Sequence, residues 1–434
     1  GLLFVGSETG IFMSVNDGKN WQKLQGNFPV VPVYDIKIQQ DDLVVGTHGR
    51  SFWILDDLTP LRELTGQSSG TETKISGIRF FPPRTTYRST LIWSVNLFLG
   101  DGKNYSPAFG LPGTHYQETT PDGEKRLCHL DMGENPPEGV IVNYFIESEA
   151  NFKPEKPLEL IVLDANGVEI ERFSTKKTDE KLDRSESEES ETSDDKASLT
   201  AKVGFNRFVW NMHYPGPEVK IDKSLEKVGY KPLGRGEDGP GGGPIAPPGS
   251  YQVCLKLGEN EIRHSFEIVK DPRLNTSPED FSAQFELWIK IRNRVSDVNS
   301  AINHIRRIKL QITELLAREN FNNSAEEKSF GEIQKGAEAL REKFNKLENE
   351  LTQNQYETPS DRLRHPTMLK QRMEALVSVV AVADAAPPQQ AYSVFEHLSV
   401  LIDQRLAELS ELEEQEVVRL NQQIDQAGIR KLQG

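Results

Sequence analysis

The side chains best suited to ligand recognition lie in the first 64 residues, where His48, Arg50 and Trp53 follow an apolar, strand-like run. An arginine can bind a carboxylate through two parallel hydrogen bonds, and aromatic rings stack on flat ligands. Glu8 occupies the place that matches His48 in an upstream copy of the same stretch. We take Glu8, His48, Arg50 and Trp53 as candidate ligand-binding residues. The alternative is that Arg50 and Trp53 pack and hydrogen-bond between neighbouring repeats.

The sequence contains no recognisable catalytic or metal-binding pattern. His-Glu-x-x-His and Cys-x-x-Cys are missing, and the eight histidines are scattered without metal-ligand spacing. The run Gly66-Gln67-Ser68-Ser69-Gly70 lies in a short polar linker, so it does not read as a Gly-x-Ser-x-Gly nucleophile elbow. A glycosidase needs two carboxylates that face each other across a cleft. Asp35, Asp56 and Asp57 are the acids to consider, but adjacent carboxylates more often cap a turn. We therefore predict no catalytic residue, no metal site and no cofactor in this chain.

The stretch Val44–Asp57 has a near copy 40 residues upstream. In this alignment Val45-Gly46-Thr47 falls on Val5-Gly6-Ser7, and Phe52 falls on Phe12. A repeat of about 40 residues built from short strands is the period of a β-propeller blade. Propellers close with about 4–8 blades. We expect residues 1–64 to be the C-terminal blade or blades of a propeller, and the missing N-terminal portion to be the partner of this chain.

A second signal is the segment from Ser14 to Trp21, which has the form S-x-N-x-G-x-x-W. It resembles the aspartate box of BNR-repeat proteins, which include sialidases, xyloglucanase-type glycosidases and sortilin-type propellers. Asn16 stands where the box usually has aspartate, and it can make a similar turn. The box is a structural hairpin and not an active site. Its residues here are Ser14, Asn16, Asp17, Gly18 and Trp21.

Residues 47–64, THGRSFWILDDLTPLREL, resemble the last blade of bacterial secreted proteins with sortilin-like or BNR propellers. In that group the propeller is followed by a β-sandwich and a helical tail, and the resemblance covers essentially the whole chain. It implies a protein that is secreted, periplasmic or on the cell surface. The catalytic acids of its glycosidase members cannot be assigned to residues of this chain, because those acids lie on blades that the chain lacks.

Residues 76–270 read as short alternating strands, which favours a β-sandwich of immunoglobulin or fibronectin shape. Two insertions are expected in it: a loop-rich one at 97–133 and an acidic, disordered one at 176–198. Two cysteines are too few for a disulfide scaffold, and their pairing stays open. The clearest strands are Val140–Ser148, Leu158–Asp164, Glu169–Ser174, Gly204–Asn211, Gly249–Gly258 and Glu261–Val269, and the cysteines are Cys128 and Cys254.

Residues 275–434 change to a helical period. Ser277-Pro278-Glu279-Asp280 predicts a helix start, with a cap, a proline and acids in the first turn. Apolar stripes on strongly polar helices predict an antiparallel helical bundle. We expect helices from Pro278, over about 325–351, over about 366–385, and from Pro388 to about Ala427. The fold class is therefore a mixed multidomain one: propeller blade, sandwich and bundle.

Composition excludes some partners. The net charge of -15 argues against nucleic acid and against an anionic membrane surface. No run approaches the roughly 20 apolar residues of a membrane helix, so we expect no membrane insertion. The favoured function is non-catalytic binding of a protein, peptide or glycan by the completed propeller. The alternatives are a BNR-type glycoside hydrolase whose acids lie on the missing blades, and a structural component of an extracellular assembly.

Overall fold

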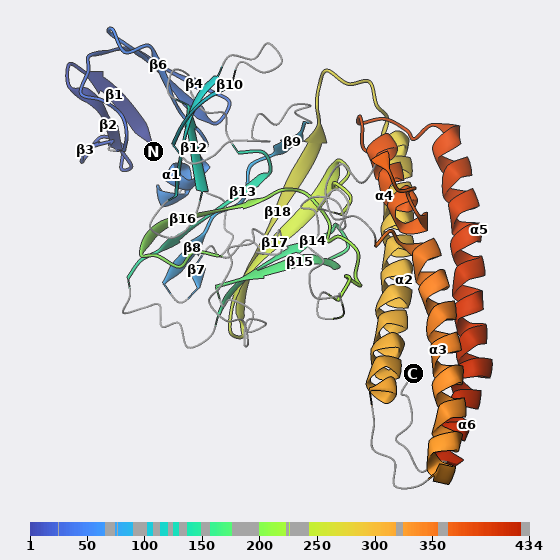
Figure 1. Cartoon of the computed structure of the whole chain (residues 1–434). Coiled ribbons are helices and arrows are strands. Elements are labelled where there is room, and N and C mark those ends of the chain that lie inside the picture. The colour runs from blue at the N-terminus through green and yellow to red at the C-terminus, as the bar shows by residue number, and fades with distance from the viewer. Residues whose placement is uncertain are drawn as a thin grey trace. The chain divides into compact units, whose positions relative to one another are not determined.

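The computed structural model describes most of the chain in two compact units (Figure 1). Unit 1 comprises Gly1–Arg184, Lys196–Met212 and Pro248–Pro272, and unit 2 comprises Ser185–Asp195, His213–Pro247 and Arg273–Gly434. The described residues are 1–24, 26–65, 74–75, 77–89, 102–106, 113–119, 125–129, 137–148, 157–175, 199–222, 225, 243–317, 324–354 and 363–426.

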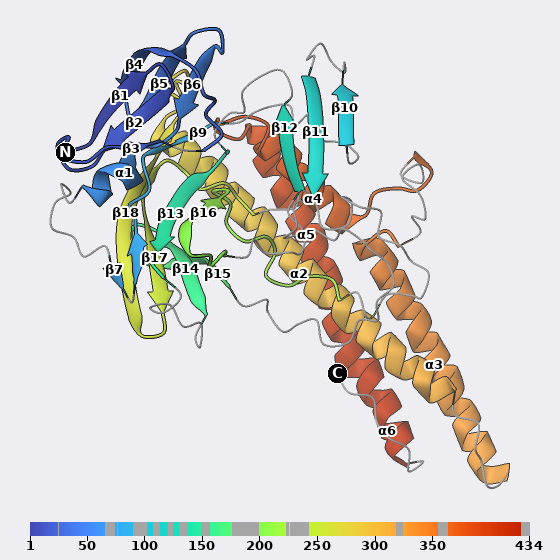
Figure 2. The same ribbon diagram turned by 90° about the vertical axis from the view of Figure 1, so that its left-hand side faces the viewer.

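Unit 1 begins with two three-stranded antiparallel sheets that lie beside each other (Figure 2). In each sheet the strands follow the order of the chain. A short helix, α1 (Thr59–Leu64), follows the second sheet. The first sheet holds β1 (Leu3–Ser7), β2 (Gly10–Ser14) and β3 (Gln22–Lys23), and the second holds β4 (Val33–Gln39), β5 (Asp42–Thr47) and β6 (Phe52–Leu55).

One face of the first sheet packs against one face of the second sheet. Ile11 of the first sheet shares a buried cluster with Leu43 and Val45 of the second, and Leu58 closes it. The Val33 side chain of β4 lies so close to β1 that a Cβ placed on Gly6 would be 2.6 Å from Val33 Cγ1. Glycine is therefore required here by the close approach of the two sheets.

The register of the hairpins corrects one detail of the sequence alignment. Val5 pairs with Phe12 in the first sheet, whereas Val45 pairs with Trp53 in the second. Trp53, and not Phe52, therefore occupies the place of Phe12. The second hairpin has a longer turn, and a shift of one residue moves a side chain to the opposite face of a sheet. Sequence alignment alone could not see this shift.

The rest of unit 1 contains two larger sheets. Their inner faces meet through aromatic side chains: Trp210 of one sheet contacts Tyr251 and Phe266 of the other. The four-stranded sheet has the order β16 (Gly204–Trp210), β13 (Val140–Ile146), β8 (Ile78–Phe80), β7 (Lys74–Ile75). The five-stranded sheet has the order β15 (Glu169–Ser174), β14 (Leu158–Leu163), β17 (Gly249–Leu257), β18 (Asn260–Lys270), β9 (Thr86–Arg88).

Local interactions account for the burial pattern of β18 and for the turn between β14 and β15. In β18, Ile262, His264, Phe266 and Ile268 are buried, and the intervening side chains are exposed, as expected of a strand with one covered face. The turn between β14 and β15 is held by Asp164, whose Oδ1 accepts the backbone N–H groups of residues 166 and 168 at 2.9 and 2.8 Å.

The expectation of a loop-rich insertion at 97–133 was wrong in part. The structure has three strands there, β10 (Gly102–Ser106), β11 (Gly113–Thr119) and β12 (Lys125–His129), and they form an antiparallel sheet. The strands are only five to seven residues long. Their signal was hidden by the glycines and prolines between them. The acidic insertion at 176–198 lies outside the described residues.

Cys254 is a free, buried thiol on β17, so it is not paired with Cys128. Burial, with a smaller contribution from the negative charge of Glu261, raises the pKa of Cys254 to about 11. The thiolate is the reactive form. In a Cys128→Ser variant, we therefore expect iodoacetamide at pH 8 to modify Cys254 slowly in the folded protein and rapidly in urea. Mass spectrometry over time would measure this, and rapid modification without urea would contradict it.

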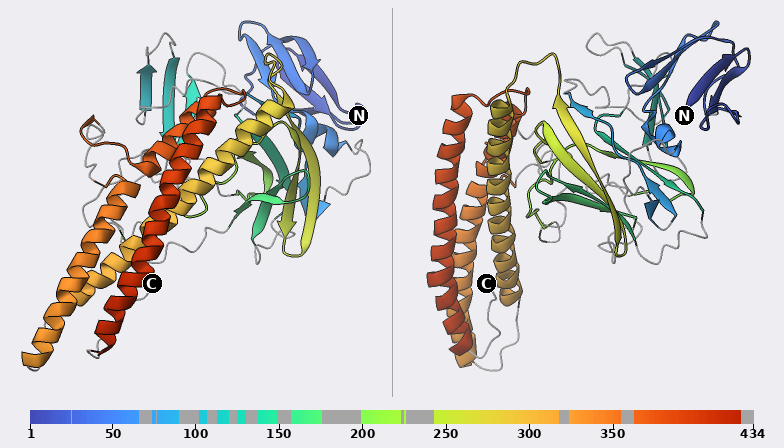
Figure 3. Two further views of the ribbon diagram at one scale, coloured as in Figure 1. Left: turned by 90° about the vertical axis from the view of Figure 1, so that its right-hand side faces the viewer. Right: turned by 180° about the vertical axis from the view of Figure 1, so that it is seen from behind.

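Unit 2 is built from helices that share one hydrophobic core (Figure 3). The first helix begins as predicted, because Ser277 Oγ accepts the Asp280 N–H and the Asp280 carboxylate accepts the Ser277 N–H. Within the described residues, no helix is long and apolar enough to cross a membrane. The helices are α2 (Pro278–Leu316), α3 (Ser324–Leu351), α4 (Leu369–Val380), α5 (Gln389–Glu411), the π-helical η5 (Leu412–Val417) and α6 (Val418–Gln426).

Two helix boundaries differ from the sequence prediction. Helix α4 ends at Val380, five residues before the predicted end, because the Gln284 amide of α2 donates hydrogen bonds to the carbonyls of Val380 and Ala383. The last predicted helix is interrupted by the π-helical segment η5. Both features depend on packing between helices, which a stripe of apolar residues does not encode.

Helix α2 also forms hydrogen bonds with an extended segment of the chain, residues 213–222. The Asn299 amide donates to the Val219 carbonyl at 2.8 Å, and the Asn303 amide donates to the Lys220 carbonyl at 2.7 Å. The Asn303 oxygen accepts the Asp222 N–H at 2.8 Å. Both asparagines are buried. These polar positions within an apolar stripe are thus explained by contacts with the backbone of the segment.

Candidate binding surface

The candidate residues lie at the hairpin turns of the first two sheets. Glu8 lies in the two-residue turn between β1 and β2, and His48 and Arg50 lie in the turn between β5 and β6. All three side chains are exposed. Within the described residues, neither Glu8 nor Arg50 forms an ion pair. Their charges are therefore available to a ligand at these turns.

His48 is part of an exposed aromatic pair that the sequence did not reveal. Its ring stacks on Tyr34, with centroids 5.0 Å apart and planes within 15°. Tyr34 is 71% exposed, so the outer face of its ring is open to solvent. Tyr34 lies at a register shift of β4, between Val33 and Asp35. That local irregularity sets where its side chain points, and it left no signal in the strand pattern.

Trp53 serves the fold and does not present a free indole. Its N–H donates to the Arg50 carbonyl at 3.0 Å, and its ring packs edge-on against Phe28. These contacts hold the turn that carries His48 and Arg50. The alternative considered from the sequence placed the hydrogen bonds of Arg50 and Trp53 between repeats, whereas this hydrogen bond of Trp53 lies within its own hairpin. We therefore place Trp53 beneath the turn, as a residue that positions the others.

The aspartate-box segment forms a hydrogen-bonded turn. Ser14 Oγ accepts the Gly18 N–H at 2.9 Å, and Asn16 Oδ1 accepts the Asn20 N–H at 2.9 Å. Gly18 has φ of +81°, and Trp21 packs beside it. Asp17 is exposed and also takes a left-handed backbone, with φ of +59°. Asn16 thus makes the turn contacts expected of an aspartate, and the segment uses its polar groups internally.

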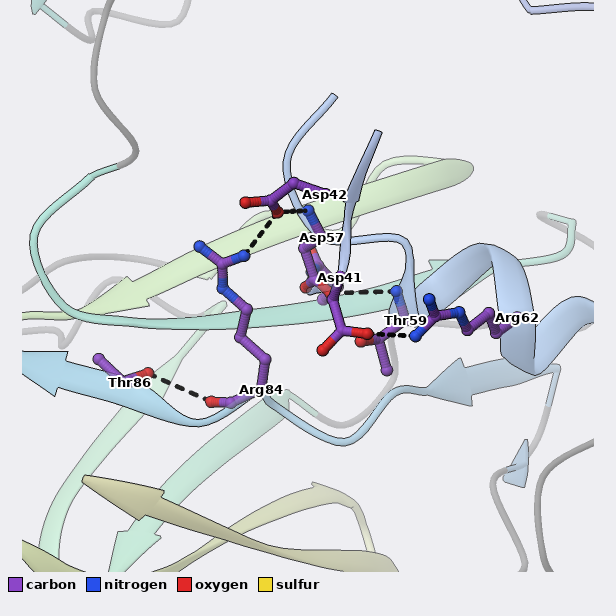
Figure 4. A network of polar contacts seen from close by, with 8 residues as sticks. Asp41, Asp42, Asp57, Thr59, Arg62, Arg84 and Thr86 are labelled. Atoms are coloured by element: carbon purple, nitrogen blue, oxygen red, sulfur yellow. Dashed lines mark hydrogen bonds and ion pairs between the residues drawn. The ribbon is translucent and has the colours of Figure 1, made fainter. Parts of the chain in front are cut away.

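Asp57, one of the acids considered for a glycosidase, is engaged with Asp42 in a structural network (Figure 4). Asp42 Oδ1 accepts the Arg84 guanidinium at 2.8 Å and the Asp57 N–H at 2.9 Å. The buried Asp57 carboxylate accepts the Thr59 N–H at 3.1 Å and the Asn143 amide at 3.4 Å. Together these contacts join the second sheet to β13 and the segment before β9. They hold these parts of unit 1 together.

Asp56 and Asp35 are the other two acids considered from the sequence. Burial, followed by the negative charge of Asp42, raises the pKa of Asp56, and Arg84 and Arg207 oppose this rise. Asp35 Oδ1 accepts the N–H of the next residue at 2.9 Å. In the described part of the chain, no group of three or more His, Cys, Asp or Glu residues could hold a metal ion.

The two sheets end in apolar faces that nothing in the described structure covers. On the first sheet, Leu3 and Val5 are 43% and 46% exposed. On the second sheet, Phe52 and Ile54 are 77% and 59% exposed. We call these the first and second free faces. Exposed apolar faces of this kind mark interaction sites in soluble proteins.

The free faces correspond to packed faces in the neighbouring repeat. Gly6 lies on the packed face of the first sheet, and its counterpart Gly46 lies on the free face of the second. Conversely, Val5 lies on the free face of the first sheet, and its counterpart Val45 is 2% exposed in the packed face of the second. Each free face is thus equivalent to a face that already packs against a sheet.

No family model, curated protein or solved structure matches this chain. The chemistry of the surface must therefore be judged from its own residues. It offers a cation, an anion and an open aromatic ring at the turns, and two apolar faces beside them. Such a surface can bind other molecules and stack on other sheets.

Proposed function

We propose that this chain is the non-catalytic C-terminal part of a secreted or cell-surface propeller protein that binds a protein, peptide or glycan. Residues 1–64 supply two neighbouring sheets of the propeller, the first lacking its inner strand and the second its outer strand. The four- and five-stranded sheets and the helices then follow as a β-sandwich and a helical bundle, which serve as spacers or assembly surfaces.

The observation that carries the proposal is the pairing of faces in the two-sheet stack. The face of the first sheet that holds Gly6 packs on the face of the second sheet that holds Val45. The face that holds Val5 in the first sheet and the face that holds Gly46 in the second sheet are left free. A stack of this kind can continue in both directions until it closes on itself, as the blades of a β-propeller do. The apolar side chains Leu3, Val5, Phe52 and Ile54 are exposed here and would be buried by neighbouring sheets.

The ligand would be captured at the turns that hold Glu8, His48 and Arg50. The open ring of Tyr34 can stack on a sugar or an aromatic side chain, and Arg50 can bind a carboxylate. Loops carried by a rigid scaffold are the usual place for binding residues. Trp53 supports this role by fixing the turn from below.

The first test is the composition of the native assembly. Intact mass and N-terminal sequencing of native material, run beside a denaturing gel, are expected to reveal further sheet repeats, on this polypeptide or on a second one. A glycan and peptide screen on that assembly, with Arg50→Ala and Tyr34→Ala variants, then locates the ligand. A native protein that consists of residues 1–434 alone and stays monomeric would contradict the proposal.

The two equivalent glycines give a matched test of the stacking. Gly6→Ala is expected to cost about 1–3 kcal/mol, because the new methyl group would overpack the interface with Val33. Gly46→Ala should change stability by less than about 0.5 kcal/mol, because its Cβ would meet only Asp35 and Phe52 at ordinary distances of 3.7–3.8 Å. Urea unfolding of the isolated chain measures both.

In the assembled protein Gly46→Ala should no longer be tolerated. A neighbouring sheet on the second free face would approach Gly46 as Val33 approaches Gly6, so Gly46→Ala should weaken assembly while leaving the isolated chain stable. Equal tolerance of Gly46→Ala in both settings would show that no sheet stacks on this face.

A further inference from the structure

One face of helix α2 carries polar side chains that bind the main chain of another segment. Ser296, Asn299 and Asn303 follow one another at steps of three and four residues, so they lie on the same face of the helix. The two asparagines are 4% and 5% exposed. We call these three residues the polar stripe and the segment that they contact, residues 213–222, the strap. Both belong to unit 2.

Asn303 recognises the strap with both ends of its amide. It donates to the Lys220 carbonyl at 2.7 Å and accepts the Asp222 N–H at 2.8 Å. An asparagine side chain has both donors and an acceptor, so it can replace the partners that a neighbouring strand would supply. A contact of this kind depends on an extended main chain and not on particular side chains.

The other two residues of the polar stripe act in the same way. Ser296 Oγ accepts the Val219 N–H at 3.3 Å, and the Asn299 amide donates to the Val219 carbonyl at 2.8 Å. Upstream, the ring of Tyr214 packs edge-on against Phe285 of α2, with centroids 4.8 Å apart. The site therefore combines main-chain recognition with one position for an aromatic side chain.

The strap does not use everything that the polar stripe offers. Among the described residues, nothing donates a hydrogen bond to the buried Asn299 Oδ1, and an unmet buried acceptor is costly. No residue of the strap is itself buried, and Ile221 packs only partly against the helical core. A segment with few buried contacts opens more readily than the helices beneath it. An extended chain that also satisfied Asn299 would therefore compete with the strap.

We propose that the polar stripe binds an extended segment of another protein, and that the strap is a displaceable occupant of the same site. The partner is recognised by its main chain at the positions that correspond to Val219, Lys220 and Asp222. It carries an aromatic residue where the strap has Tyr214, and a donor that reaches Asn299 Oδ1 gives it an advantage over the strap. This site lies in unit 2 and does not depend on the function proposed for the sheets.

The test uses a labelled peptide that copies residues 214–222, YPGPEVKID, titrated to about 1 mM against the full chain by fluorescence polarisation. Hydrogen exchange in the same samples reports whether the peptide takes the place of the strap. The expected result is saturable binding, with faster exchange of the protein's own Val219 and Asp222 amides. Binding that leaves this exchange unchanged would overturn the proposal.

Asp222→Pro is the decisive variant, because proline removes the strap N–H that Asn303 accepts and leaves the polar stripe intact. The peptide keeps its own N–H, so it should bind this variant about fivefold more tightly than the wild type, the effect of one ordinary hydrogen bond. Asp222→Ala keeps the N–H, controls for the lost carboxylate and should bind as the wild type does. Equal affinities for the three chains, or no binding to any of them, would overturn the proposal.

Two further readouts locate the contact and identify the occupant. A methyl group on the peptide nitrogen that corresponds to Asp222 should weaken binding to Asp222→Pro about fivefold. In Asp222→Pro/Asn303→Leu the two peptides should bind equally, because the acceptor is gone. A difference that persists there would place the peptide elsewhere and overturn the proposal. If the wild-type chain forms a dimer that the peptide dissociates, the occupant is the strap of a second copy, and the proposed partner is wrong.

Discussion

Replacing Glu348 by alanine is expected to lower the free energy of unfolding of the helical unit by about 3–5 kcal/mol. The carboxylate of α3 accepts Arg306 at 2.7 Å and Lys309 at 2.6 Å, both from α2. The Glu348 side chain is 4% exposed, and the two cations are 12% and 19% exposed. Without Glu348 two largely buried positive charges would lose this carboxylate. Urea unfolding followed by the helical circular-dichroism signal measures the loss.

Glu350→Ala is the matched control, two residues along the same helix. Its ion pair with Arg405 is 39% exposed on the glutamate side, so we expect a cost of about 0–1 kcal/mol. Similar losses for the two variants would mean that burial of the Glu348 cluster does not decide its contribution.

The same cluster predicts a pH dependence. Burial alone would raise the pKa of Glu348, but Lys309 and Arg306 outweigh it and hold the pKa below its ordinary value of 4.5. A carboxyl with a lowered folded pKa contributes stability that is present above its unfolded pKa and is lost as the pH falls through the folded pKa. The gap in stability between wild type and Glu348→Gln should therefore be full at pH 7 and narrow below about pH 4.5.

The second large effect is expected in unit 1, where Trp210→Ala should cost about 3–5 kcal/mol. Trp210 is 1% exposed and fills the space between the two larger sheets, against Tyr251 and Phe266. Removal of the indole would leave a cavity that both sheets line. Hydrogen exchange of β17 and β18 should accelerate in this variant, and urea unfolding gives the size of the loss.

Phe205→Ala provides the control on the same strand. Phe205 is 54% exposed on the opposite face of β16, so its removal should cost about 1 kcal/mol or less. If both variants lose the same stability, the two faces of β16 are not different environments, and the described core is wrong.

Much of the local structure follows from the sequence because its causes are local. The capping box at Ser277 and Asp280, the turn at Asp164 and the glycine turn at Gly18 each need only a few neighbouring residues, and each is present in the structure. The repeat of 40 residues likewise located two similar hairpins. The candidate residues Glu8, His48 and Arg50 were found through that repeat, and they lie at exposed turns.

The remaining features depend on contacts between segments that are distant in the chain. The position of Trp53 depends on the register between β5 and β6. The stacking of the Tyr34 ring on His48 depends on a register shift in β4. The hydrogen bonds of Asp42 and Asp57 depend on Arg84 and Asn143, which follow them in the sequence by 42 and 86 residues. The end of α4 required Gln284, almost 100 residues earlier.

The sequence by itself determined where most helices and strands begin, the repeat, the turn chemistry and which charged residues are exposed at turns, since these depend on period, capping and conformational preference over short spans. Only the tertiary structure decided which faces of the two sheets are packed and which are free. A side chain's periodicity says that one face is apolar, but it does not say what covers that face. That depends on a second sheet whose register and position are set elsewhere in the chain.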